Sequence, residues 1–251
     1  MNTYRTAEIA HRIGIHPNTV RLYEELGLIP KPVRKPNGYR IFTDVHVEQF
    51  RLARLALQVE VLQSGLRKQA IEIIKISASG DFDRAIELTE GYIQHIRKEK
   101  YHAEEAVAIA EQVLSGDIQE EGNLLFTRKE LSDHLQISMD TLRNWEMNGL
   151  LTVKRKQNGY RIYTVEDSRR LKMIRSLRCA NYSLSAILRM LNALACNPRA
   201  NIREIIDTPK ENDDIISVCD KLLTSLQYAE TNAQSMQDQL VKMKKQFNPP
   251  L

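Results

Sequence analysis

Cysteine is scarce in this sequence: the 251 residues include only Cys179, Cys196 and Cys219. An odd number of cysteines at wide, irregular spacing excludes a disulfide framework and is typical of a reducing compartment. Long apolar runs are lacking too, since no stretch approaches the roughly 20 apolar residues that cross a bilayer. The first residues also lack the charged segment and apolar run of a secretion signal. We therefore expect a cytoplasmic protein with three free thiols and no membrane partner.

Sequence motifs for catalysis and metal binding are also missing. We find no phosphate-binding loop, no pair of catalytic carboxylates and no glycine-rich dinucleotide turn. The six histidines lack the spacing of metal ligands, and none is paired with a serine or cysteine as a nucleophile would require. These histidines are His11, His16, His46, His95, His102 and His134. The sequence therefore predicts no enzyme, no metal site and no cofactor.

The charge of the chain is unevenly distributed. The formal net charge is only +4, but residues 128–178 contain twelve Lys or Arg against six Asp or Glu, and residues 81–114 contain four against eight. A basic region of domain size is typical of phosphate recognition, although solvated basic faces are equally common. With 42% hydrophobic residues, the length fits two small domains with cores of their own.

An internal repeat organises the chain. At an offset of 122 residues, apolar positions match apolar positions and several polar identities match too. The matched pairs are Tyr4 with Phe126, Glu8 with Glu130, Ile9 with Leu131, Ile13 with Leu135, Ile15 with Ile137, Thr19 with Thr141, Val20 with Leu142, Arg21 with Arg143, Tyr23 with Trp145, Glu24 with Glu146, Gly27 with Gly149 and Leu28 with Leu150. After a one-residue deletion, which a surface loop tolerates, residues 37–43 match residues 158–164.

Each copy of the repeat predicts a helix, a turn, a second helix and a β-hairpin wing. The first helices are expected at 6–13 and 128–135, and the second helices open at Pro17 and near Ser138, a proline and a serine suited to a helix start. Gly27 and Gly149 end the second helices, and an Asn-Gly pair between β-prone segments then predicts the hairpin. In such units the second helix enters the major groove and the wing lies over the flanking backbone.

The second helix of each copy presents polar side chains on one face. Residues recur there at steps of three and four, so they can read base edges together: Asn18, Arg21 and Glu25 in the first copy, Asp140, Arg143 and Met147 in the second. Val20 and Leu142 fall on the opposite face and are assigned to the core. Cations in the wing loops 31–35 and 154–156 can neutralise phosphates, which predicts a steep fall of affinity with salt.

These residues resemble the MerR family of transcriptional regulators, whose pattern Thr-x-Arg-x-Tyr-Glu, Gly-Leu and Gly-Tyr-Arg-x-Tyr occurs twice. It is present in residues 19–24, 27–28 and 38–42, and again in residues 141–146, 149–150 and 159–163, where Trp145 replaces the tyrosine. The resemblance covers residues 3–75 and 125–192. It implies a protein that binds a palindromic or nearly palindromic promoter site in double-stranded DNA, distorts it, and acts on RNA polymerase, with a small-molecule effector in some members.

On this basis we predict the DNA-contacting residues of each copy. They are Asn18, Thr19, Arg21, Tyr23, Arg34, Lys35, Tyr39 and Arg40 in the first copy, and Asp140, Thr141, Arg143, Trp145, Lys154, Arg155, Lys156, Tyr160 and Arg161 in the second. The resemblance implies that the Arg and the wing Tyr-Arg positions contact the DNA backbone.

Two heptad seams of equal length follow the two copies. In residues 82–114 and 215–247, mostly apolar residues recur at strictly alternating steps of four and three, which predicts coiled-coil helices. The seams are Phe82, Ile86, Thr89, Ile93, Ile96, Lys100, Ala103, Val107, Ala110 and Leu114, and Ile215, Cys219, Leu222, Leu226, Ala229, Ala233, Met236, Leu240, Met243 and Phe247. The family pairs such helices antiparallel between two chains, so one chain with two copies can form a pseudo-dimer by itself, although pairing between chains is a rival.

The predicted fold is mainly α-helical. It has winged helix-turn-helix domains at 1–78 and 125–195, a coiled-coil helix after each at 79–115 and 213–247, and linkers at 116–124 and 196–212. Antiparallel pairing places Ile96 opposite Ala233 and Lys100 opposite Ala229, large against small, which packs better than small against small.

Alternative functions stay open at this stage. A metal sensor is suggested by Cys196 and Cys219, which flank the start of the second predicted coil, but Cys219 is a seam position and no close Cys/His cluster accompanies it. An architectural DNA-binding protein can combine the same elements without switching transcription, and the breadth of its footprint would distinguish it.

A drug-responsive regulator is a further alternative, although the chain has no separate large effector domain. Such a regulator needs a ligand pocket between the domains and the coils. The candidate lining residues are Tyr92, Tyr101, Tyr182 and Tyr228, although packing roles are favoured for them.

Overall fold

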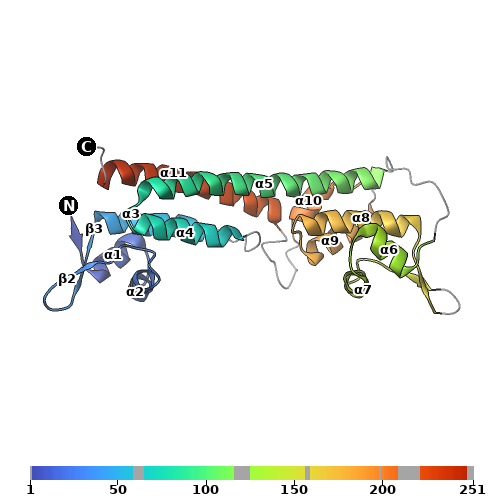
Figure 1. Ribbon diagram of the computed structural model, residues 1–251, viewed down its shortest axis with the longest axis horizontal. Helices are drawn as coiled ribbons and strands as arrows, with labels where there is room; N and C mark the ends of the chain where they lie inside the picture. The colour runs from blue at the N-terminus through green and yellow to red at the C-terminus, as the bar shows by residue number, and fades with distance from the viewer. Residues whose placement is uncertain are drawn as a thin grey trace. The chain divides into compact units, whose positions relative to one another are not determined.

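The computed structural model describes residues 2–58, 65–115, 125–155, 159–197, 199–208 and 221–247, and these residues are mainly helical (Figure 1). Contacts divide the chain into two compact units. Unit 1 comprises Met1–Lys98 and Ser225–Leu251, and unit 2 comprises Glu99–Thr224. Each unit holds one copy of the repeat, and the long helix α5 (Phe82–Ser115) contributes its first half to unit 1 and its second half to unit 2.

Unit 1 begins with a short winged domain followed by two helices. Its elements are β1 (Thr3–Tyr4), α1 (Thr6–Ile13), α2 (Pro17–Glu25), β2 (Val33–Arg34), β3 (Arg40–Thr43), α3 (Asp44–Leu57) and α4 (Leu66–Ala78). The strands form an antiparallel sheet in the order β1-β3-β2, in which Arg34 faces Arg40. The bounds of α1 and α2 agree with those predicted from the sequence.

The core of the first winged domain consists of the apolar positions of the repeat. Buried side chains from α1, α2, β3 and α3 pack together, and Tyr4, Ile15 and Tyr23 close the edge of this core. The buried set is Ile9, Ala10, Ile13, Val20, Ile29, Phe42, Val47 and Phe50. Removing this apolar surface from water stabilises the orientation of α2 relative to the wing.

Unit 2 repeats this plan with small differences. Its elements are α6 (Arg128–Leu135), α7 (Met139–Met147), β4 (Lys154–Arg155), β5 (Arg161–Ile162), α8 (Val165–Cys179), α9 (Leu184–Cys196) and α10 (Ile202–Asp207). Strands β4 and β5 form an antiparallel pair, and the place of β1 is taken by a single bridge between Phe126 and Tyr163. The predicted start and end of α6 agree with the structure.

Local capping explains where the corresponding helices of the two units begin. Thr43 and Thr164 cap α3 and α8, each in a capping box with the residue three positions later, His46 or Asp167. The helices α2 and α7 end before Gly27 and Gly149, whose φ angles of 68° and 76° lie in the left-handed region that glycine tolerates best.

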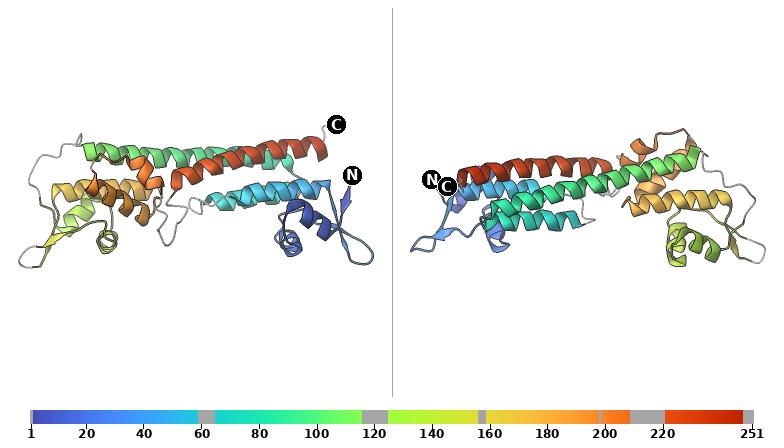
Figure 2. Two further views of the ribbon diagram at one scale, coloured as in Figure 1. Left: turned by 180° about the vertical axis from the view of Figure 1, so that it is seen from behind. Right: turned by 45° about the horizontal axis from the view of Figure 1, so that its top comes forward.

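In unit 1, the first part of α5 lies beside α11 (Leu222–Phe247), and the two run in opposite directions (Figures 1 and 2). The residue numbers of their contacts rise along α5 as they fall along α11. The side-chain pairs are Asp83 with Lys244, Glu90 with Gln237 at 3.3 Å, and Arg97 with Glu230 at 2.8 Å. Of the predicted seam of α11, the seven positions from Leu222 to Met243 are buried.

The structure describes only part of the predicted linkers. Residues 116–124 and 209–220 lie outside the described residues, and with them Cys219 and the predicted start of the second coil. Within the predicted linker 196–212 the structure has a helix, α10. Asn201 caps it, and Ile202 and Ile206, one turn apart, are 4% and 0% exposed. Two buried isoleucines at helical spacing therefore turn part of this segment into a packed element.

None of the helices among the described residues is both long enough and apolar enough to span a membrane.

Candidate nucleic-acid interface

The second helix of each winged domain is fixed at its start by a side-chain cap. His16 Nδ1 accepts a hydrogen bond from the Asn18 N–H at 3.2 Å, with Pro17 in the first turn of α2. Ser138 Oγ accepts one from the Thr141 N–H at 3.0 Å at the start of α7. Both caps satisfy amide groups that the helix itself leaves unpaired. The helices are thus positioned before any ligand is bound.

One face of each second helix is buried and the other is exposed. Val20 and Leu142 are 0% exposed, as the repeat predicts for core positions. The opposite faces carry Asn18, Arg21, Leu22 and Glu25 on α2, and Asp140, Arg143, Asn144 and Met147 on α7, all of them exposed. Leu22 and Asn144 were not among the predicted residues, although each lies one turn after Asn18 or Asp140. In each unit the second helix itself lies on the side away from α5 (Figures 1 and 2).

The wings extend from the same domains and carry exposed aromatic and basic side chains. Tyr39 and Tyr160, at the ends of the two hairpins, are 70% and 73% exposed. Four cations at predicted wing positions are exposed too: Arg34, Lys35, Lys154 and Arg155. Lys156, also predicted to contact DNA, lies outside the described residues. A hairpin with these side chains can contact phosphates by charge and by hydrogen bonds.

An ion pair connects the second helix to the wing in each unit. In unit 1, Glu24 of α2 accepts a hydrogen bond from Nε of Arg40 on β3, and Arg34 Nη2 lies 3.5 Å from the same carboxylate. In unit 2, Arg161 Nε of β5 lies 2.8 Å from Oε2 of Glu146 on α7. Sequence reasoning assigned no role to either glutamate. The repeat could have indicated this role, because Glu24 and Glu146 are identical in its two copies and both precede a Gly-Tyr-Arg segment.

The glutamate of unit 2 has two further partners. Arg128 Nη2 lies 3.1 Å from Oε2 of Glu146, and the Tyr163 hydroxyl donates a hydrogen bond to Oε1. Burial, and then this hydrogen bond, raise the pKa of Tyr163 to about 12. The equivalent positions of unit 1 are Thr6 and Phe42, and phenylalanine has no hydroxyl to donate. Glu146 therefore connects α7 not only to the wing but also to α6, through Arg128.

Two predicted contact residues pack against the core. Trp145 is only 5% exposed, because its position on α7 turns the indole into the core, and its contact with DNA stays a prediction. The ring of Tyr23, at the same place in unit 1, stacks on Phe50 with 5.4 Å between centroids, and burial raises its pKa. Thr19 and Thr141 are half-buried, and Thr141 Oγ1 lies 2.9 Å from Ser138 Oγ. Both threonines remain predicted contacts.

The described residues form no metal-binding cluster. Among the described residues, no three His, Cys, Asp or Glu side chains are grouped closely enough to hold a metal ion. Cys179 and Cys196 are exposed free thiols.

Two family profiles match separate parts of this chain. Residues 126–194 match the MerR HTH family regulatory protein profile, and residues 5–42 match the MerR family regulatory protein profile. No solved structure gives a significant match.

Several regulatory proteins are similar to parts of this chain. The chain is 40% identical over 53 residues to the HTH-type transcriptional regulator CueR of Salmonella typhi, covering 21% of this chain and 38% of CueR. It is 37% identical over 51 residues to the mercuric resistance operon regulatory protein of Bacillus cereus, covering 20% and 39%. With the HTH-type transcriptional regulator YfmP of Bacillus subtilis it shares 31% identity over 105 residues, 40% of this chain and 69% of YfmP. The chain therefore belongs to the MerR family of transcriptional regulators.

Proposed function

We propose that the chain is a sequence-specific DNA-binding transcriptional regulator in which α2 and α7 each enter a major groove. One observation carries this proposal: both units expose an arginine on the second helix and tie that helix to a basic wing through a Glu–Arg pair. A rigid helix–wing unit is what groove binding needs, because the wing can then set the register on the phosphates while the helix contacts bases.

The wings and the second helices supply the attraction to DNA. Arg34, Lys35, Lys154 and Arg155 are exposed on the hairpins, and Arg21 and Arg143 are exposed on the helices. Each phosphate that they neutralise releases counterions, so the logarithm of the affinity should fall with the logarithm of salt by about 0.9 per phosphate contact. Tyr39 and Tyr160 add exposed hydroxyls that can hydrogen-bond to the backbone.

The same chain can read two different half-sites. The exposed face of α2 carries Leu22 and Glu25 where α7 carries Asn144 and Met147, and only the arginine is shared. An apolar side chain fits a thymine methyl group, whereas asparagine can make two hydrogen bonds to adenine. We infer that the target is an imperfect palindrome, which a symmetric homodimer has no means to prefer.

We further propose that one chain acts as a pseudo-dimer through α5 and α11. Support comes from the three antiparallel side-chain pairs between these helices. Bound to a promoter, such a pseudo-dimer would distort the duplex, at a cost of about 1–6 kcal/mol for a short site, and RNA polymerase would respond to the altered promoter.

Selection of the duplexes that the chain binds, followed by a measurement of the mass of the complex, tests this function. Duplexes bound by the full chain are enriched from a random library, and the affinity for the enriched duplex is measured from 50 to 300 mM salt. We expect one asymmetric two-part motif, a complex of one chain per duplex and a salt slope of several units. A flat salt dependence or the lack of any enriched motif would contradict DNA recognition, and a complex of two chains per duplex would contradict the pseudo-dimer.

A further inference from the structure

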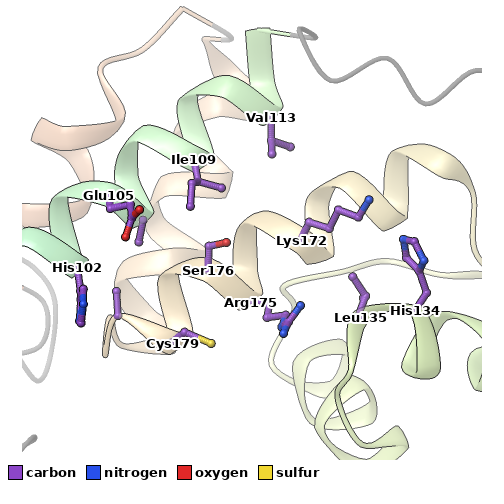
Figure 3. Close-up of a pocket in the computed structure, with 12 residues that line it drawn as sticks. His102, Glu105, Ile109, Val113, His134, Leu135, Lys172, Arg175, Ser176 and Cys179 are labelled. Carbon is purple, nitrogen blue, oxygen red and sulfur yellow. The ribbon is translucent and has the colours of Figure 1, made fainter.

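A pocket of about 520 Å³ lies within unit 2, among the second half of α5 and the helices α6 and α8. It is separate from the exposed face of α7. Figure 3 shows Ile109 and Val113 of α5 on one side, Lys172 and Arg175 of α8 on another, and His134 at the end of α6. Its volume falls in the range of about 300–1,000 Å³ that is usual for small-molecule sites.

The lining of this pocket is apolar on one side and cationic on the other. Apolar side chains come from α5 and from the end of α6: Ala106, Ile109, Val113 and Leu135. The polar side has Lys172 and Arg175 on α8 at a spacing of three, so that both lie on the same face of the helix. Glu105 is the one acidic residue among the lining side chains. The net charge of the lining is therefore positive even with both histidines neutral.

In unit 1 a carboxylate connects α3 to the helix that covers it. There Glu48 of α3, which is 8% exposed, accepts a hydrogen bond from Gln239 of α11 and lies within 3.5 Å of Lys242 Nζ on the same helix. The repeat aligns Glu48 with Arg169, so α8 has no carboxylate at this position to bind the covering helix. In the second copy a cation, Arg169, therefore stands where the first copy has the anion that contacts the covering helix.

We propose that this pocket binds a small organic anion with an apolar body, of the class of medium-chain or aromatic carboxylates. Lys172 and Arg175 hold the carboxylate, and arginine is well suited to this because its planar fork can donate two parallel hydrogen bonds. The apolar body lies along Ile109 and Val113, where it is removed from water. A neutral analogue lacks the charge that the two cations recognise, and an organic cation is repelled.

Binding there has a direct route to the DNA-reading helix. Arg175 Nη2 lies 3.5 Å from Oε1 of Gln136, which is in the turn between α6 and α7 and has a φ of 50°. A carboxylate that takes Arg175 removes this contact with the turn that positions α7. This step rests on the proposed function, whereas the binding site itself does not.

Octanoate serves as the probe, with octanamide as its neutral control. Alkylation by iodoacetamide is followed separately for Cys179, which lines the pocket, and for Cys196, an exposed thiol outside the lining. We expect octanoate to slow alkylation of Cys179 at least fivefold and that of Cys196 by less than twofold, and octanamide to leave both unchanged. Equal protection of the two thiols, or protection by octanamide, would overturn the proposal.

Variants then assign the anion site. The double variant Lys172→Gln with Arg175→Gln should weaken octanoate binding, measured by calorimetry, at least tenfold, and Ile109→Trp should abolish it by filling the pocket. Arg51→Gln, at the position of unit 1 that corresponds to Lys172, is the matched control and should bind octanoate as well as the unchanged chain. Circular dichroism verifies that each variant is folded, and undiminished binding by the folded double variant would refute the site.

Affinity for the selected duplex is measured in the same samples. A fivefold or larger change with octanoate supports coupling through Arg175, and an unchanged affinity refutes the coupling while the site stands on the calorimetry. A chain that binds octanoate but no duplex would refute the proposed function alone.

Discussion

Arg161 Nε lies 2.8 Å from Oε2 of Glu146, so a wing strand of unit 2 is held against the helix that we propose to enter the major groove. Arg40 and Glu24 make the equivalent contact in unit 1. Because the side chain of Glu146 is only 9% exposed, this pair is screened by salt less than a surface pair. In each unit, wing and helix should therefore move together.

Glu146→Gln should destabilise unit 2. Arg128 and Arg161 would lose a charged partner, and hydrogen bonds to charged groups contribute about 1.5–3 kcal/mol each. Since both arginines are partly exposed, at 26% and 31%, we expect a loss of about 2 kcal/mol in total. The fluorescence of Trp145, the single tryptophan, reports urea unfolding of this unit. Glu166→Gln, at an exposed position of α8, is the control, and equal unfolding midpoints for both variants would contradict a stabilising role of the Glu146 ion pairs.

Arg21→Ala and Arg143→Ala should each weaken binding to the selected duplex without unfolding the chain. Both side chains are exposed on the second helices, and a well-placed arginine contributes about 1–3 kcal/mol to base discrimination. Affinity measured by fluorescence anisotropy should therefore fall roughly 5- to 150-fold. Lys245→Ala removes an exposed cation from α11 and should change affinity little. If both arginine variants bound as tightly as this control, the assignment of the reading faces would be wrong.

The stability of unit 1 should fall as the pH is lowered through about 6.5. His46 is 6% exposed, and burial lowers its pKa below the ordinary value, opposed only in part by the Pro30 backbone and Glu24. The unfolded chain therefore takes up a proton at a pH where folded His46 stays neutral, so the stability present above this pH is lost below it. Protonation also removes the Nδ1 lone pair that accepts from the Thr43 N–H at 3.0 Å.

Urea unfolding followed by circular dichroism from pH 7.5 to 5.5 measures this effect. His46→Gln retains a side chain that can complete the capping box and should show a smaller dependence on pH. His11→Gln changes an exposed histidine and should keep the dependence of the unchanged chain. The same dependence in the His46 variant as in the His11 variant would exclude His46 as its source.

Much of the winged architecture could be predicted from local sequence signals. The bounds of α1, α2 and α6 follow from caps and from the period of the apolar positions, and these are determined by a few neighbouring residues. Gly27 and Gly149 mark helix ends because few other residues tolerate a positive φ. The seam of α11 was predictable too, since the seven positions from Leu222 to Met243 are buried at heptad spacing.

Contacts between distant residues could not be predicted in the same way. The repeat shows that Glu24 and Glu146 are identical, but their partners Arg40 and Arg161 come from another element, and pairing depends on how the hairpin folds back. Trp145 lies three residues after the buried Leu142 and on the same face of α7, so helical spacing already indicated its burial. The pocket beside α8 depends on which helix covers that face, so no local pattern indicated it.

The turn between the two helices offers a test of backbone strain. Gly14 ends α1 with a φ of 71°, and its counterpart Gln136 ends α6 with a φ of 50°. Left-handed backbone costs a residue with a Cβ roughly 1 kcal/mol, which glycine avoids at some cost in unfolded-state entropy. Gln136→Gly should therefore stabilise unit 2 by up to about 1 kcal/mol, read from Trp145 fluorescence. Gly14→Ala should destabilise unit 1 by about 1 kcal/mol, although the nearest atom to the added Cβ is 3.8 Å away. Destabilisation of unit 2 by Gln136→Gly, or stabilisation of unit 1 by Gly14→Ala, would contradict a strained turn.

Helices α5 and α11 should pair within one chain in solution. Glu90 Oε1 and Gln237 Nε2 are 3.3 Å apart, so cysteines at these positions should be joined by a short bismaleimide. The experiment starts from a chain whose Cys179, Cys196 and Cys219 are replaced by serine, and the single variants Glu90→Cys and Gln237→Cys are the controls. A bridge within a chain forms at a rate that does not depend on protein concentration, whereas a bridge between chains slows on dilution. We therefore expect the double variant to give a compact, monomer-sized product whose yield is unchanged over a hundredfold dilution. If tagged and untagged chains are mixed and products of mixed size form, the helices instead pair between chains.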